Sequence, residues 1–145
     1  MAESERPRIV VGVDGSPASA RALDWAFGQA ETTGADVDAV TAWDIPTSLG
    51  FGPTVLDGED LAGAAGQVLA EAVAAARPRH PQVTVTQIVS RGHPAAVLLH
   101  QAKGAKMLVV GSHGHGGFAG ALLGSTSVYC TQHATCPAVV VRDSE

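Results

Sequence analysis

The feature that most constrains the fold is a regular alternation of short apolar runs with longer helical patterns along the whole chain. The apolar runs are rich in β-branched residues, as in RIVVGV at 8–13, which is typical of parallel strands buried on both faces. Strict strand–helix alternation requires right-handed crossovers. It therefore predicts a doubly wound α/β fold, with a mainly parallel five-stranded sheet and four helices. We expect strands at 8–13, 36–43, 83–90, 107–110 and 138–142, and helices at 17–33, 61–73, 94–103 and 125–133.

The helix boundaries carry recognisable signals. Ser16 suits an N-cap and Pro17 a first helical position, while Gly34 is placed to end that helix. Gly92-His93-Pro94 most simply starts another helix. The two tryptophans, Trp25 and Trp43, are expected in the core.

The chain is expected to form one domain, 1–145, with an ordered core at about 7–142, because its 145 residues show no linker, repeat or low-complexity tract. For the strand order 3-2-1-4-5, the winding direction reverses between the first and fourth strands. Ligands of such sheets bind at this reversal, beyond the carboxyl ends of the strands. Those ends carry Asp14 and Gly111.

Charge and hydropathy exclude some classes of function. The net charge is −5, and the nine Lys and Arg residues are scattered, which gives no basis for general binding of nucleic acid or acidic membranes. The first residues lack an apolar signal core, and no run approaches the roughly 20 apolar residues of a membrane span. We therefore expect a cytoplasmic protein that binds neither nucleic acid nor membrane.

The two cysteines flank a histidine, in the order Cys130, His133, Cys136. Two thiols and one imidazole make an incomplete zinc set, and a reducing cytosol disfavours a structural disulfide. We expect both cysteines to be ordinary packed residues.

The segment 111–127 (GSHGHGGFAGALLGSTS) leaves a predicted strand and enters a predicted helix. Glycines let backbone N–H groups turn toward an anion, and the amides of a helix N-terminus add partial positive charge, so this pattern favours a phosphate-binding loop. It is neither a Walker loop nor the GxGxxG fingerprint. The alternative is a surface loop whose glycines only make turns.

Further residues are placed to complete a nucleotide site. Asp14 either accepts hydrogen bonds from a ribose or adenine, or approaches a phosphate-bound Mg²⁺, or is simply a turn residue. His113 and His115 are candidate phosphate contacts, and the backbone of Ala42 is placed to face a base. No residue is predicted to be catalytic. The predicted nucleotide-binding set is Gly12, Asp14, Ala42, Val110, Gly111, Ser112, His113, Gly114, His115, Gly116, Gly117, Gly124, Ser125, Thr126 and Ser127.

Three segments together, 11–23 (VGVDGSPASARAL), 111–127 and 136–141 (CPAVVV), resemble the universal stress protein family over essentially the whole chain. The spacing G-x2-G-x9-G-[ST] is similar to its ATP-binding branch. The resemblance implies a Rossmann-like, adenine nucleotide α-hydrolase-like fold that binds ATP, ADP or AMP, with or without Mg²⁺. It also implies that Asp14 is the ribose- or metal-associated aspartate and that Gly111–Gly114 and Gly124–Thr126 contact phosphates and ribose.

The resemblance further implies a homodimer through the last strand, 138–142, and an apolar edge strand independently favours such pairing. Two positions depart from the family pattern: Lys106, where an acidic residue is frequent, and Tyr129-Cys130, where small or polar residues are usual.

Three functions remain open. The first is a non-catalytic, ATP-binding regulatory module of the stress response. The second is a slow Mg²⁺-dependent ATPase or nucleotidyl-transfer enzyme that uses Asp14 with His113 or His115. The third is a nucleotide-free dimerisation module.

Overall fold

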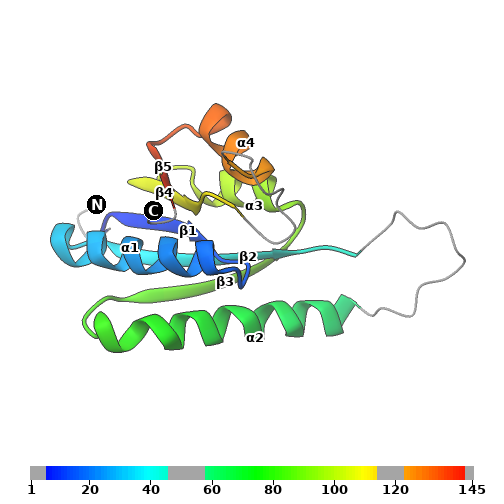
Figure 1. Cartoon of the computed structure of the whole chain (residues 1–145), viewed down its shortest axis with the longest axis horizontal. Coiled ribbons are helices and arrows are strands. Elements are labelled where there is room, and N and C mark those ends of the chain that lie inside the picture. The colour runs from blue at the N-terminus through cyan, green and yellow to red at the C-terminus, as the bar shows by residue number, and fades with distance from the viewer. Residues whose placement is uncertain (1–5, 46–57, 114–122, 143–145) are drawn as a thin grey trace, which may run out of the picture.

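The computed structural model describes residues 6–45, 58–113 and 123–142. Strands and helices alternate along the described chain, and a single 3₁₀ turn, Arg77–Arg79, follows the second helix (Figure 1). The elements are β1 (Arg8–Gly12), α1 (Pro17–Thr33), β2 (Asp36–Trp43), α2 (Gly58–Ala76), β3 (Val85–Arg91), α3 (Pro94–Gln101), β4 (Met107–Gly111), α4 (Ser125–His133) and β5 (Ala138–Val141).

The strands form one five-stranded sheet in the order β3-β2-β1-β4-β5, and every neighbouring pair is parallel. The predicted fold class and strand order are therefore confirmed. At the centre of the sheet, Val10 of β1 lies opposite Asp38 of β2 and Leu108 of β4. The winding reverses between β1 and β4, as the alternation predicted.

The sheet separates two apolar cores. Successive side chains of a strand point to opposite faces, so Ile9 and Val11 of β1 join one core and Val10 joins the other. The first core is filled by α1 and α2, with Phe27 and Leu69 both wholly buried. The second is smaller and is filled by α3 and α4, where Cys130 is wholly buried. Burial of the central strands on both faces explains why their sequences do not alternate.

The predicted helix boundaries have a physical basis in the structure. The side chain of Ser16 caps α1 by accepting a hydrogen bond from the backbone N–H of Ser19, and Pro17 follows it. Gly34 ends the helix in the left-handed region, at φ 76°, where glycine is least strained. His93 is the N-cap of α3, and its Nδ1 accepts a hydrogen bond from the N–H of Ala95.

Several predicted boundaries differ from the structure by one to three residues. Helix α2, for example, spans Gly58–Ala76 rather than 61–73, and two further differences have a visible cause. The third strand begins at Val85 rather than residue 83, because the N–H of Val83 turns back to the carbonyl of His80 and its own carbonyl accepts from Arg77. Helix α3 ends at Gln101 rather than residue 103. There the guanidinium of Arg8 binds the carbonyls of Gln101 and Lys103, which terminates the helix.

The tryptophans are less buried than predicted. Trp25 packs only partly buried against the first core, and the ring of Trp43 lies beneath the guanidinium of Arg91, 5.7 Å from its centroid. Across the described residues, no helix has the length and apolar character that crossing a membrane requires.

Candidate functional site

The candidate site lies where β1 and β4 end side by side. These central strands pair in parallel, with Val11 opposite Val109, so their carboxyl ends meet at one edge of the sheet. Asp14 follows β1 and is exposed, while Gly111 is the last residue of β4. A Cβ atom on Gly111 would lie 2.7 Å from the backbone of Ala18, in the first turn of α1. Glycine is therefore needed here to let α1 pack against the end of β4.

The turn that carries Asp14 is held by its own polar groups. Oδ1 of Asp14 accepts a hydrogen bond of 2.9 Å from the N–H of Ser16, and the N–H of Asp14 donates to Oγ of Ser19. Gly15 adopts φ 84°, which favours glycine. The hydroxyl of Thr41, on β2, donates to the carbonyl of Val13. These contacts fix the backbone beneath an exposed carboxylate.

Thr41 belongs to the site's support and was not predicted. Its side chain is buried, although it stands in an otherwise apolar stretch of β2. A buried hydroxyl needs a hydrogen-bond partner, and a lone threonine in such a run was the available signal.

On the β4 side, two buried serines fasten the chain at both ends of the glycine-rich segment. Ser112 donates its N–H to the carbonyl of Val141 and accepts at its own carbonyl from the N–H of Gly124, at 2.6 Å. The hydroxyl of Ser127 donates to the carbonyl of Gly111, also at 2.6 Å. Ser112 and Ser127 are each 3% exposed, so these contacts join the end of β4 to the start of α4 inside the protein.

The start of α4 is open by comparison. Gly124 is its N-cap, and no side-chain hydrogen bond caps the helix among the described residues. Its first intrahelical bond joins the N–H of Val128 to the carbonyl of Gly124, so the N–H groups of residues 125–127 precede it. Ser125 is exposed and Thr126 half-buried. Such a helix start carries partial positive charge and suits an anion.

The remaining predicted residues fall into two groups. Gly12, Ala42 and Val110 lie at or next to the ends of their strands. A Cβ on Gly12 would meet Leu98 at 2.8 Å, and the side chains of Ala42 and Val110 pack on the second core. His113 is half-buried beside Ser112, with its Nδ1 3.2 Å from the serine hydroxyl. The other group, Gly114, His115, Gly116 and Gly117, lies outside the described residues.

A depression of about 310 Å³ opens on the other side of the Asp14 turn, between α1 and α2. Ser16 and Ser19 line it from α1, and Val68, Glu71 and Ala72 from α2. The Glu71 carboxylate would repel a phosphate, so the start of α4 is the better anion site.

The structure also shows the surroundings of the possible metal ligands and of the two cysteines. Among the described residues, no group of three or more His, Cys, Asp and Glu side chains is arranged to hold a metal ion. Both cysteines are free. Burial raises the pKa of the Cys130 thiol to about 11, and burial also raises that of Cys136, against a smaller opposing effect of Arg8. Neither thiol is activated for chemistry.

Comparison with known sequences now decides the family. The model that describes the universal stress protein family matches residues 5–142. The chain is a member of this family. A universal stress protein of Mycolicibacterium smegmatis is 44% identical over 145 residues, an alignment that covers 97% of the chain and 47% of the relative. One from Mycobacterium tuberculosis is 39% identical, with 99% and 48% covered. The chain thus spans about half the length of the curated relatives it matches.

Solved structures share the fold. A universal stress protein crystallised in complex with cAMP is 26% identical, with a TM-score of 0.73, and the match covers 97% of this chain and all of that one. A family member from Arabidopsis thaliana with AMP bound has a TM-score of 0.66 over 95% of this chain and 92% of its own, and at 20% identity it supports the fold alone.

The two departures from the family pattern fit the fold. Lys106 is exposed just before β4. On α4, Cys130 fills the second core and is wholly buried, while the neighbouring Tyr129 points outward, 48% exposed, and stacks on His133 at 4.1 Å. The unusual pair therefore places one side chain inside and one outside.

Proposed function

We propose that this universal stress protein binds an adenine nucleotide at the β1–β4 edge and acts as a nucleotide-dependent regulatory module of the stress response, not as a catalyst. The observation that carries the proposal is the start of α4, which no side chain of the described residues caps and which Ser112 and Ser127 hold beside the end of β4. Its amides offer an anion site, and the exposed carboxylate of Asp14 follows the neighbouring strand, where a ribose could donate hydrogen bonds to it.

We propose ATP as the ligand, with ADP and AMP as close competitors. The spacing G-x2-G-x9-G-[ST], from Gly111 to Ser125, supports phosphate binding, because the amides of residues 125–127 precede the first intrahelical hydrogen bond of α4. The cAMP complex of a 26% identical relative supports an adenine nucleotide in general. An Mg²⁺ ion would reach the site with the phosphates, near Asp14.

Calorimetric titration with ATP, ADP, AMP and cAMP, of the unaltered chain and of the variant Gly124→Val, tests the proposed phosphate position. Gly124 has φ −75°, which valine tolerates, so the variant should fold while its side chain blocks the approach of phosphates. We expect affinity for ATP to fall on the order of tenfold or more, about 1.4 kcal/mol. Gly63→Val is the matched control, since a side chain there meets open space on α2. Equal ATP affinity in both folded variants would contradict the proposed phosphate position.

The rate of ATP hydrolysis distinguishes the non-catalytic module from an enzyme. Efficient phosphoryl transfer needs positioned cations and a group that orients the nucleophile, and the described edge offers Asp14 and His113. We expect turnover far below about 1 s⁻¹. ATP hydrolysis at about 1 s⁻¹ or faster that Asp14→Ala abolishes would contradict the non-catalytic proposal and favour an enzyme. Absence of any bound nucleotide and of any heat with ATP would favour the nucleotide-free module.

We also propose that a second copy of the chain pairs with β5. This strand contacts β4 through the carbonyls of Pro137 and Val141, which accept from Leu108 and Ser112, so Ala138 and Val140 direct their backbone groups to the open edge. Val140→Pro removes an outward N–H, whereas Val139→Pro removes an inward one. In sedimentation, Val140→Pro should be a folded monomer. A dimer unaffected by Val140→Pro would place the interface elsewhere.

A further inference from the structure

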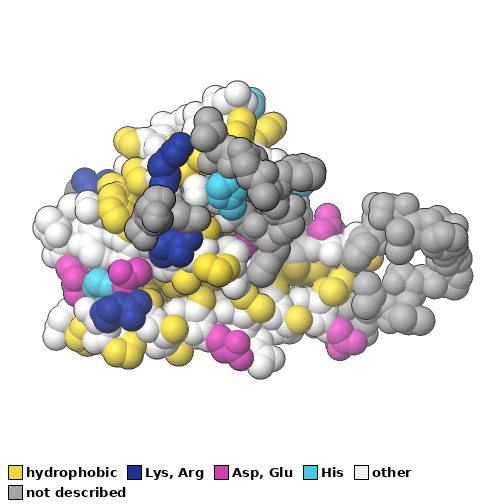
Figure 2. All heavy atoms as spheres, in the orientation of Figure 1, with side chains coloured by type: hydrophobic (Ala, Val, Ile, Leu, Met, Phe, Trp, Pro, Cys, Tyr) yellow, Lys and Arg dark blue, Asp and Glu magenta, His cyan; other side chains and the backbone are white. Residues whose placement is uncertain are grey.

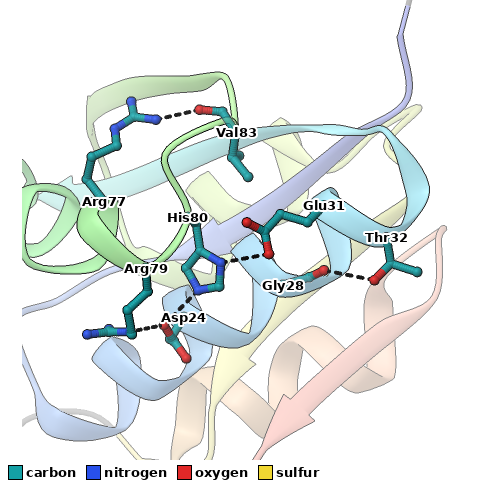
Figure 3. A network of polar contacts seen from close by, with 8 residues as sticks. All are labelled: Asp24, Gly28, Glu31, Thr32, Arg77, Arg79, His80 and Val83. Atoms are coloured by element: carbon teal, nitrogen blue, oxygen red, sulfur yellow. Dashed lines mark hydrogen bonds and ion pairs between the residues drawn. The ribbon is translucent and has the colours of Figure 1, made fainter.

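A cluster of charged side chains joins helix α1 to the connection between α2 and β3 (Figure 3). His80 follows the 3₁₀ turn directly. Its Nε2 lies 2.9 Å from Oδ1 of Asp24, and its Nδ1 lies 3.0 Å from Oε1 of Glu31, with both carboxylates on α1. Figure 2 shows acidic, basic and histidine side chains gathered over this end of the molecule. One imidazole thus bridges two carboxylates that are seven residues apart.

The imidazole is enclosed. Its side chain is 12% exposed, and its ring packs edge-on against Phe27, with the centroids 5.6 Å apart and the planes at 85°. Nδ1 is shielded from solvent and makes no hydrogen bond of good geometry within the described part of the chain, so the carboxylate of Glu31 is its close polar neighbour. Water cannot easily take the place of that carboxylate.

The two contacts decide the protonation state. A neutral imidazole has one N–H and one lone pair, so it can offer a proton to only one of two ionised carboxylates. The lone pair would then face the other carboxylate at about 3 Å, unsolvated, which is repulsive. An imidazolium carries a proton on each nitrogen, so both Asp24 and Glu31 face a positively charged N–H and attract it.

We propose that His80 is a proton-dependent clasp, which binds the α2–β3 connection to α1 while the imidazole carries both protons and loosens when one proton leaves. The clasp ties residues that are 56 positions apart in sequence.

The charged groups around His80 favour the doubly protonated imidazole. Besides the two carboxylates of α1, Arg79 faces the cluster from the 3₁₀ turn, with its Nε 2.8 Å from Oδ1 of Asp24, while Arg77 points away to the carbonyl of Val83. Burial alone would lower the pKa of His80, but the contacts with Glu31 and Asp24 outweigh it and raise that pKa above 6.5. Burial alone would raise the pKa of Asp24, but Arg79 and His80 outweigh it and lower that pKa.

The direction of the pH dependence follows from these shifts. Because the pKa of His80 is raised in the folded protein, its stabilisation is complete below the unfolded value near 6.5 and is lost as pH rises through the folded value. Because the pKa of Asp24 is lowered, its part is lost as pH falls through the folded value. The clasp is thus closed between the folded-state pKa values of Asp24 and His80, and it loosens as pH rises through the pKa of His80.

Nitrogen NMR of the histidine rings in the full chain tests the protonation state. At pH about 6.5, both ring nitrogens of His80 should carry protons, and the titration midpoint should fall in Glu31→Gln, which keeps the size of the side chain. A single neutral tautomer of His80 at that pH, or a midpoint at or below 6.5, would overturn the proposal.

Urea unfolding between pH about 6 and 9 tests the stabilisation. The folding equilibrium constant of the unaltered chain, divided by that of His80→Gln, should fall as pH rises, about tenfold for each unit between the folded and unfolded pKa values of His80. His100→Gln, an exposed histidine in the last turn of α3, is the matched control and should leave the pH profile unchanged. A ratio for His80→Gln that does not vary with pH would overturn the clasp.

Discussion

Helices α1 and α4 start in the same surroundings and complete their first turns differently. Each follows one of the two paired central strands, at the edge where the winding reverses. At α1, Ser16 caps the helix, Pro17 has no N–H to satisfy, and Asp14 accepts from Ser16. At α4, the N-cap is Gly124, which has no side chain to offer. The protein itself completes the start of α1, whereas no side chain of the described residues caps the start of α4, where we propose that a ligand binds.

The same difference extends to the serines. Around α1, serine side chains accept from the helix amides and so satisfy them, as Ser16 does for Ser19. Around α4, the buried Ser127 donates to a strand carbonyl, so it anchors the chain without blocking the amides. The proposed anion site therefore combines two kinds of polar residue: buried ones such as Ser127, which hold the backbone in place, and exposed ones such as Ser125 at the surface.

We expect the largest loss of stability from a substitution at Gly111, where the end of β4 packs against the first turn of α1. In Gly111→Ala, the new methyl group would press against the backbone of Ala18, which cannot retreat without moving α1. We expect a loss of roughly 1–3 kcal/mol in the free energy of unfolding, measured by urea denaturation. Gly28→Ala is the control, since a methyl group there meets open space in α1 and should leave stability unchanged or improved. A Gly111→Ala variant as stable as the control would mean that α1 and β4 are not closely packed.

Removing a serine from each helix start should separate stability from binding. Ser16→Ala deletes the cap of α1 and should cost about 1 kcal/mol of unfolding free energy with little change in ATP affinity. Ser125→Ala removes an exposed hydroxyl that caps nothing in the described structure, so stability should change by less than about 0.5 kcal/mol while ATP affinity falls. Urea denaturation and calorimetry of both variants check this. The reverse pattern would assign the anion site to α1.

We expect the smallest effect in the reactivity of the two thiols, Cys130 on α4 and Cys136 just after it. Cys130 is wholly buried, and burial raises its pKa to about 11, whereas Cys136 is partly exposed. A thiol reagent at pH about 8 should therefore modify Cys136 first and reach Cys130 only on unfolding. Mass spectrometry of the labelled peptides reads this directly. Early labelling of Cys130 would show that α4 opens easily, which would weaken its role as a fixed anion site.

Local rules predicted the fold well, because each element of a doubly wound sheet carries its own signal. The apolar runs gave the strands, and Ser16, Gly34 and Pro94 marked helix ends that the structure confirms. The later start of β3, at Val85 rather than residue 83, could not be predicted in the same way. It depends on a turn in which the N–H of Val83 donates a hydrogen bond to the carbonyl of His80.

For the candidate site, the sequence predicted a position at the carboxyl ends of β1 and β4, and this stays a prediction. It did not predict the contacts that each residue makes there. The hydroxyl of Ser127 was predicted as a ligand donor, and in the structure it binds the carbonyl of Gly111, sixteen residues away. Thr41 and the clasp at His80 were missed for the same reason, because their partners are distant in sequence. Contacts of this kind arise only from packing, which a pattern along one chain does not record.

The most direct test of the contrast between α1 and α4 is an NMR titration of the full chain with ATP, following backbone amides. The account predicts that the amides of Ser125 and Thr126 shift strongly and saturate with the ligand, while those of Ala18 and Ser19, at the self-capped start of α1, move much less. Larger shifts at Ala18 and Ser19 than at Ser125 and Thr126, or no shift at either helix start, would contradict it.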